Sequence, residues 1–226
     1  MNRAVHLALL AAMVAACGRE RPVLTPPCPE PDSLAPWAVV SRSFRDTTGA
    51  RWTNDSLRTV LLTLATRDQA GRADFGARVN DPVYAKRLIA LDSALALSVD
   101  TILDRFGLPT RSMVGAKGAT AIMLVVQHNG RLQRKVLALA KTAPAGEVPL
   151  EAVAMMEDRL LVADKQSQVY GTQFNIESDG RMTFATTSDL GGLESRRAKV
   201  GLMPLPLYAC MMLEAGMRID TASLPH

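Results

Sequence analysis

The sequence is arranged around one short polar stretch, Gln168-Val169-Tyr170-Gly171-Thr172-Gln173. A half-buried strand would alternate apolar and polar residues. This stretch, named here the 168–173 segment, instead places two amides, a phenol and a hydroxyl around a glycine. Amide and hydroxyl side chains both donate and accept hydrogen bonds. We therefore expect the segment to be a polar loop where neighbouring elements meet, and the candidate site to lie beside it.

The segment is flanked by a helix and a hairpin. The preceding helix opens at Pro149 and turns one apolar face inward, made of Val153, Met156, Leu160 and Leu161. After the segment, residues 173–176 and 181–186 enclose the turn Ser178-Asp179-Gly180. Asp-Gly between two alternating runs is a strong hairpin signal. The sequence thus predicts one β-hairpin next to a helical body.

Apolar spacing predicts helices through the rest of the chain. The predicted helices cover residues 54–72, 81–97, 98–107, 112–130 and 131–143. They are followed by the helix that opens at Pro149 and by a last pair of helices after Asp189. Ser98 is expected to cap the third of these helices, and Gly130 to end the fourth. Ile122 to Val126 is apolar on all sides, which marks a central buried helix. The predicted fold is a mainly α, single-domain helical bundle with one hairpin, over residues 37–226.

Composition limits the class of protein. The chain of 226 residues is 48% hydrophobic and 21% charged, which is typical of one globular domain. A net charge of +4, without basic residues clustered on one face, does not indicate a nucleic-acid partner.

The N-terminus predicts export and lipidation. Residues 1–16 combine Arg3, an apolar run and small residues, as in a signal peptide. Cys17 follows these small residues and resembles the cysteine of a bacterial lipobox, so we expect acylation there, including palmitate. Residues 17–36 are rich in proline and predict an extended tether. We expect a protein anchored by lipid in the cell envelope, on the periplasmic face of an outer membrane where the source has one. The alternative is a plain secreted protein.

Two further cysteines remain for the domain. An exported compartment is oxidising, so a Cys28–Cys210 disulfide is one prediction. The alternative is that Cys210, inside an apolar run, is a buried small apolar residue.

Familiar catalytic motifs are absent from the sequence. It contains no phosphate loop, no G-x-S-x-G and no dinucleotide fingerprint. His128 is the one histidine away from the leader and the C-terminal residue, and no acids or thiols accompany it at the spacing of a zinc site. We therefore expect neither a metal nor a cofactor.

A set of separated motifs carries a resemblance to a known family. These are Asp68-Gln69 with Arg72, Gly107-Leu108-Pro109-Thr110, Gln127-His128, Asp158-Arg159, the 168–173 segment, and Arg196-Arg197 before Gly201-Leu202. Together they resemble an uncharacterised bacterial family of unknown function, family 6624, over about Ser56 to Tyr208. Leu108 departs from the pattern, because an aromatic residue is expected there. The resemblance implies a shared architecture and a shared site, but no reaction.

Three functions fit these residues. The first is a pocket near Tyr170 that binds an anionic small molecule or envelope component, lined by Asp68, Gln69, Arg72, Asp158, Arg159, Tyr170, Thr172, Gln173 and Arg196; arginine forks bind carboxylate and phosphate well. The second is a metal-independent hydrolase or transferase with His128 as general acid or base. The third is a structural envelope protein in which the same residues form a buried polar network and His128 only caps a helix.

Overall fold

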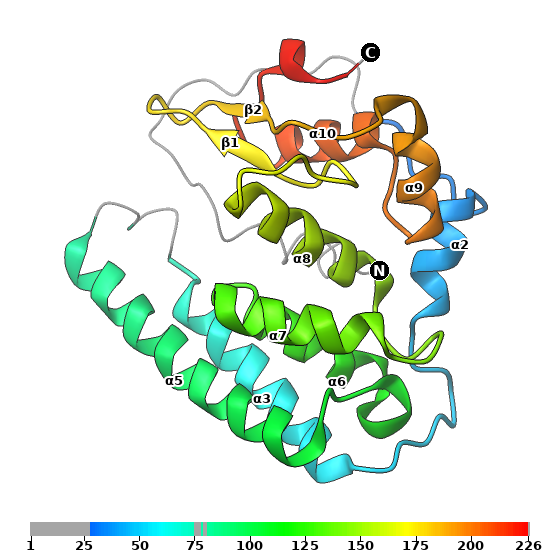
Figure 1. The fold of residues 1–226 in the computed structure, drawn as a ribbon, viewed down its shortest axis with the longest axis vertical. Coiled ribbons are helices and arrows are strands. Elements are labelled where there is room, and N and C mark those ends of the chain that lie inside the picture. Colours follow the sequence, from blue (N-terminus) through cyan, green and yellow to red (C-terminus); the bar gives the residue numbers. More distant parts are fainter. Residues whose placement is uncertain (1–27, 75–77, 79–80, 226) are drawn as a thin grey trace. The chain divides into compact units, whose positions relative to one another are not determined.

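The computed structural model describes residues 28–74, 78 and 81–225. The predicted signal peptide, Cys17 and residues 18–27 of the predicted tether lie outside the described residues. The chain is mainly helical with one antiparallel hairpin (Figure 1), which confirms the predicted fold class. It divides into two compact units, which in the described part comprise residues 44–149 and residues 28–43 with 150–225. Each unit is described by itself.

The first unit is a helical body built on a central helix. It contains α3 (Asp55–Gly71), α5 (Pro82–Phe106), α6 (Arg111–Val126) and α7 (Gly130–Lys141). Helix α6 contacts α3, α5 and α7, and Ile122, Val125 and Val126 are buried in it. The prediction of a central helix at Ile122–Val126 is confirmed, because a helix that is apolar on all sides must be covered on all sides.

Two predicted helix boundaries are wrong. Helix α5 is continuous through Ser98, whose hydroxyl bonds to the carbonyl oxygen of Ala94 inside the helix instead of capping a new one. Gly130 does not end α6. It is the first residue of α7, because the Asn129 side chain accepts the backbone N–H of Leu132 and caps that helix. His128 therefore lies between two helices, after α6 has ended at Val126.

Helix α6 contains a kink that the sequence did not predict. Gly115 has a φ of 71° and a ψ of 166°, so the helix starts afresh after it. Asp46 accepts the backbone N–H of Ala116 at 2.5 Å, which places a carboxylate at the new helix start, where negative charge is favourable. Arg58 donates to the carbonyl oxygen of Val114 at 2.7 Å and pairs with Asp46 at 3.0 Å. The kink is thus held by one ion pair that satisfies backbone groups on both sides of the glycine.

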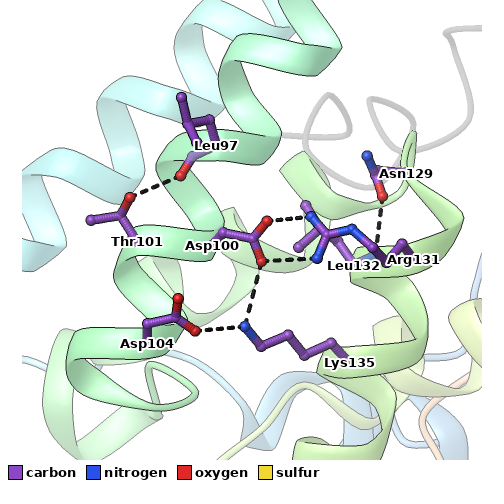
Figure 2. A network of polar contacts seen from close by, with 8 residues as sticks. All are labelled: Leu97, Asp100, Thr101, Asp104, Asn129, Arg131, Leu132 and Lys135. Atoms are coloured by element: carbon purple, nitrogen blue, oxygen red, sulfur yellow. Dashed lines mark hydrogen bonds and ion pairs between the residues drawn. The ribbon is translucent and has the colours of Figure 1, made fainter.

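Helices α5 and α7 are joined at the surface by an ion-pair network (Figure 2). Asp100 binds Arg131, and Lys135 lies 2.7 Å from Asp104 and 3.4 Å from Asp100. The Arg131 hydrogen bond holds the pKa of Asp100 below its usual range. Arg131 and Asp104 are well exposed, so water and salt weaken these pairs.

Asp100→Asn is accordingly expected to lower the melting temperature only slightly at low salt and not at all in about 1 M salt, where charges are screened. A depressed pKa gives stability that is present above the usual Asp pKa and is lost as the pH falls through the lower, folded-state pKa. Melting curves of both proteins between pH 2 and 7 should therefore converge at the acidic end. A difference that persists in high salt would contradict this reading.

The second unit contains the predicted hairpin and the remaining helices. They are α2 (Pro36–Ser43), α8 (Leu150–Ala163), β1 (Phe174–Ile176), β2 (Met182–Phe184), α9 (Leu193–Lys199) and α10 (Leu205–Glu214), with short 3-10 turns at Leu190–Gly192 and Thr221–Ser223. The strands pair Phe174 with Phe184 and Ile176 with Met182. Helix α2 packs on α9, and a disulfide joins Cys28 to Cys210 of α10. This bridge ties the start of the described chain to the last helix.

Candidate functional site

The predicted site residues fall into two sets, one in each unit. Asp68, Gln69, Arg72 and His128 belong to the first unit, and Asp158, Arg159, Tyr170, Thr172, Gln173 and Arg196 belong to the second. Within each unit the structure brings these residues into defined clusters.

Asp158 organises the 168–173 segment. Its fully buried carboxylate accepts the backbone N–H groups of Val169 at 2.7 Å, Tyr170 at 3.0 Å and Thr172 at 3.0 Å, together with the Thr172 hydroxyl at 2.9 Å. Gly171, with a φ of 65°, lets the chain turn within this curve. The segment is therefore a loop wrapped around one carboxylate, and the oxygens of Asp158 are occupied by the protein itself.

The two glutamines of the segment are also used internally. The buried Gln168 amide donates to the carbonyl oxygens of Gln173 and Ala185, both at 3.0 Å, and accepts the Gln173 N–H at 2.8 Å. The Gln173 amide donates to the Thr172 hydroxyl at 3.0 Å. The hydrogen-bonding density that singled out this stretch thus stabilises the loop and fixes it to the hairpin.

The paired arginines of α9 hold the same loop from its other side. Arg196 donates to the carbonyl oxygen of Val169 at 3.0 Å and pairs with Asp189 at 2.6 Å. Arg197 is 1% exposed and donates to the carbonyl oxygens of Tyr170 at 2.6 Å, Gly171 at 3.0 Å and Met203 at 2.8 Å. Its remaining nitrogen, Nη2, is buried and has no hydrogen-bond partner among the described residues.

Arg197 was not among the predicted ligand-binding residues, although it stands in the Arg196-Arg197 pair. The Arg196-Arg197 pair is the feature of the sequence from which Arg197 could have been selected. Sequence spacing alone does not tell which of two adjacent arginines is the buried one.

The phenol of Tyr208 in α10 lies close enough to both Arg159 and Arg197 to feel their charges. The Arg197 guanidinium carbon lies 5.3 Å from the centre of the buried Tyr208 ring. Burial raises the pKa of the Tyr208 phenol to about 12, although the nearby charges of Arg197 and Arg159 oppose this rise. Burial also lowers the pKa of both arginines. Two partly desolvated cations therefore lie near one phenol.

Arg159 has an unusual environment for a partly buried cation. Its guanidinium makes no hydrogen bond or ion pair with any residue in the described part of the chain. Partly buried charges normally have partners, because removal from water costs free energy that only an opposite charge or hydrogen bonds offset. Its neighbour Asp158 does not serve this purpose, since that carboxylate is filled by backbone N–H groups.

The backbone carbonyl oxygen of Tyr170 accepts a hydrogen bond from Arg197, which places Tyr170 beside this cluster. The Tyr170 side chain is partly buried. Burial raises the pKa of its phenol, and the charges of Glu157 and Asp158 add to the effect. The phenol therefore stays protonated at neutral pH and is available as a hydrogen-bond donor.

The cluster in the first unit is centred on Asp68 of α3. This carboxylate is fully buried, and Leu61 and Leu64 of the same helix are buried as well. Asp68 forms an ion pair with Arg72 at 3.2 Å, and the Gln69 amide donates to Oδ2 at 2.8 Å. Burial raises the pKa of Asp68, against the lowering influence of Arg72. Arg72 is in turn bound by Asp92 of α5, a residue that sequence reasoning did not select.

His128 completes this cluster from the connection between α6 and α7. Its Nε2 lies 3.9 Å from Oδ2 of Asp68, and its side chain is 23% exposed. The residues of the D-Q-x-x-R and Q-H motifs, which are far apart in the sequence, therefore meet in one place. The meeting is possible because α3 packs along α6.

Within residues 28–74, 78 and 81–225, no three His, Cys, Asp or Glu side chains gather closely enough to hold a metal ion. None of the described helices is long and apolar enough to cross a membrane.

The comparisons with known proteins point to one family. The family model of a family of unknown function (DUF6624) matches residues 55–220 of the chain. This span contains every motif named above. Searches of curated proteins and of solved structures each found no match.

Proposed function

The chain therefore belongs to this family of unknown function, and we propose that it binds a small anionic ligand through Arg159 and Arg197 of its second unit. The observation that carries this proposal is that Arg159, a partly buried cation, has no counter-charge among the described residues. An anion supplied from outside would offset the cost of keeping that cation partly out of water. The unused Nη2 of Arg197 offers a second donor near the same phenol.

The chemistry of the two side chains defines the ligand class. A guanidinium presents its N–H groups as a planar fork, which matches the two oxygens of a carboxylate or phosphate. Both arginines carry positive charge at neutral pH, because a guanidinium does not lose its proton in proteins. In this proposal the 168–173 segment holds Arg197 in place through the carbonyl oxygens of Tyr170 and Gly171. Four predicted ligand-binding residues stabilise that segment and do not contact the ligand: Asp158, Thr172, Gln173 and Arg196.

We further propose that the domain meets this ligand in the cell envelope, tethered by an acylated Cys17. The signal-like residues 1–16 and the lipobox-like cysteine motivate the proposal. The Cys28–Cys210 disulfide supports it, because disulfides persist in exported, oxidising compartments and are rare in the cytosol of most organisms. Mass spectrometry of the N-terminus purified from its natural source tests the acylation, and an unmodified Cys17 in a full-length chain would contradict it.

The binding proposal is tested with the charge-removing variant Arg159→Gln. Inorganic phosphate and succinate are added separately, and sodium chloride of equal ionic strength serves as the reference. We expect at least one of the two anions to raise the melting temperature of the wild-type protein, since a ligand at tenfold its Kd stabilises by about 1.4 kcal/mol. Arg159→Gln should lose this increase. Without ligand it should be no less stable than wild type, because an uncompensated charge has been removed.

Arg181→Gln is the matched control. It removes the same charge from the same unit, but at an exposed residue that pairs with Asp220, so the ligand-induced increase should remain. The proposal is overturned if neither anion stabilises the wild type beyond the salt reference, or if Arg159→Gln keeps the full increase. A response to phosphate alone, or to succinate alone, identifies which oxyanion the site takes.

A further inference from the structure

Helix α5 is apolar on two faces, of which only one packs on the body of the first unit. Its inward face carries Leu95, Val99 and Ile102, which are buried. Its opposite face carries Val83 and Leu97, and each of these residues is 71% exposed. The face of a surface helix that points away from the core normally carries charged and polar residues. The exposed aliphatic side chains therefore make the outer face of α5 a candidate contact surface.

The exposed apolar residues form one stripe along the helix. Val83, Ala90 and Leu97 follow one another at intervals of seven residues, and Ala94 lies between the last two. Residues seven apart lie two turns apart on the same side of an α-helix. Ala90 and Ala94 are exposed, as the two larger residues are. These four residues are named here the α5 stripe.

The hydroxyl groups beside the α5 stripe add little polarity to it. Thr101 donates to the carbonyl oxygen of Leu97 at 3.0 Å (Figure 2), and Ser93 donates to that of Ile89 at 2.8 Å. A hydroxyl that already has such a partner inside the helix leaves water at a lower cost. Ile89 is itself 66% exposed and adds apolar area next to the stripe. This face of α5 can therefore move from water to a less polar surrounding.

The unpaired charges of α5 are all positive. Lys86, Arg87 and Arg105 are exposed, and none of them has an acidic partner in the described part of the chain. The acids of the helix and its N-cap, in contrast, are neutralised by residues from other segments. Asp81, Asp92, Asp100 and Asp104 pair with Arg78, Arg72, Arg131 and Lys135 respectively. The outer face of α5 thus combines an apolar stripe with free cations.

From this combination we propose that the α5 stripe docks on a membrane surface that contains anionic lipid. The aliphatic side chains of the stripe enter the boundary between headgroups and acyl chains, as they do in helices that lie in the plane of a membrane. Lys86 and Arg87 reach the lipid phosphates with their charged ends, while their aliphatic stems follow the apolar surface. The docking is independent of the proposed anion site and of acylation at Cys17.

A second copy of the chain fits this face less well than a membrane does. Lys86 and Arg87 lie near the N-terminal end of α5, and Arg105 lies at its C-terminal end. Two stripes packed together would therefore bring cations of both copies close in a parallel and in an antiparallel arrangement. Like charges brought together across an interface weaken it. The acid at the C-terminal end, Asp104, is already bound by Lys135.

Co-sedimentation with lipid vesicles tests the proposal. The chain from residue 18 onward is used, because it retains every described residue and lacks the apolar run of the predicted leader. Vesicles of phosphatidylcholine mixed with phosphatidylglycerol should bind the protein, and vesicles of phosphatidylcholine alone should bind it much more weakly. The difference should largely disappear in about 1 M salt, where surface charges are screened.

Two double variants measure the charged and the apolar contributions. Lys86→Gln with Arg87→Gln should weaken binding to the anionic vesicles about 25-fold, since each basic residue near such a surface contributes about fivefold. Val83→Gln with Leu97→Gln should weaken it about tenfold or more, because the inserted aliphatic side chains are lost. Glutamine is a good helix former, so both variants should keep the circular dichroism of the wild type.

Each double variant has a matched control. Arg51→Gln with Lys117→Gln removes two exposed cations of the same unit that lie outside α5. Ile176→Gln removes an aliphatic side chain of the hairpin that is 54% exposed. Both controls should bind the anionic vesicles as the wild type does.

The proposal is overturned if the wild type binds both kinds of vesicle to the same extent, or if either α5 variant binds the anionic vesicles as tightly as its control. It is also overturned if analytical ultracentrifugation shows a dimer that Val83→Gln with Leu97→Gln abolishes, because a second copy then covers the stripe. The phosphate- or succinate-induced stabilisation tested above should be unaffected by the α5 variants. Failure of either proposal is thereby distinguishable from failure of the other.

Discussion

Replacement of Asp158 by alanine is expected to destabilise the second unit by about 4 kcal/mol, one of the two largest effects predicted for this protein. The substitution leaves the buried N–H group of Thr172 and the partly buried N–H groups of Val169 and Tyr170 without an acceptor. Each buried polar group that loses its partner costs about 1–3 kcal/mol. Asp158→Asn should cost less, because the amide keeps one acceptor oxygen, but its NH₂ group then faces backbone donors.

The measurement uses the tryptophans, of which each unit has one. Trp37 lies in α2 of the second unit and Trp52 in the first unit. In a Trp52→Phe background, urea unfolding followed by tryptophan fluorescence reports the second unit alone. Asp179→Ala removes an exposed carboxylate of that unit and should shift the midpoint far less. Equal shifts for Asp158→Ala and Asp179→Ala would show that the 168–173 segment does not depend on the buried acid.

Asp158 also shows what sequence reasoning could reach and what it could not. The Asp158-Arg159 pair and the 168–173 segment were recognised as related, but as possible lining of one pocket. Periodicity places a residue on a helix face, yet it does not tell whether a carboxylate there is filled by backbone N–H groups of a later loop. The two adjacent residues differ in the structure: the Asp158 carboxylate accepts several N–H groups, whereas Arg159 has no hydrogen-bond or ion-pair partner among the residues that the structure describes.

The helices were predictable where one physical effect dominates. The all-apolar Ile122–Val126 had to be buried, and the Asp-Gly turn had to form a hairpin, because few other structures suit these residues. The prediction was wrong at two glycines, because a glycine can end a helix, begin one or kink one. Gly130 was taken as a helix end but begins α7, where Asn129 supplies the cap. Gly115 lies inside the predicted helix of residues 112–130, but its backbone conformation kinks α6.

Gly115→Ala is the second substitution for which a large loss is expected, about 4 kcal/mol from the first unit. At φ 71° and ψ 166° the backbone lies in a region that is essentially reserved for glycine, and other residues there cost about 1–3 kcal/mol. An added Cβ would also lie 2.2 Å from Nη1 of Arg58 and 2.9 Å from Oδ1 of Asp46. The ion pair that holds both sides of the kink must therefore move, and the carbonyl of Val114 and the N–H of Ala116 lose their partners.

Gly107→Ala is the control that separates these two causes. Gly107 has a φ of 69° and a ψ of −159°, close to the conformation of Gly115, but an added Cβ meets nothing within 4 Å. It should therefore show the backbone cost alone. Unfolding is followed through Trp52 in a Trp37→Phe background, because Trp52 stacks on Arg58 at 4.0 Å and reports the kink directly.

A double-mutant cycle with Arg58→Ala then isolates the steric part. Once the guanidinium is gone, the cost of Gly115→Ala should fall toward that of Gly107→Ala, because the closest contact of the added Cβ is removed and only the contacts with Asp46 and Trp52 remain. If Gly115→Ala costs the same with and without Arg58, the crowding around Gly115 contributes nothing. The glycine would then be required for its φ alone, and the Asp46–Arg58 pair would be a consequence of the kink instead of its support.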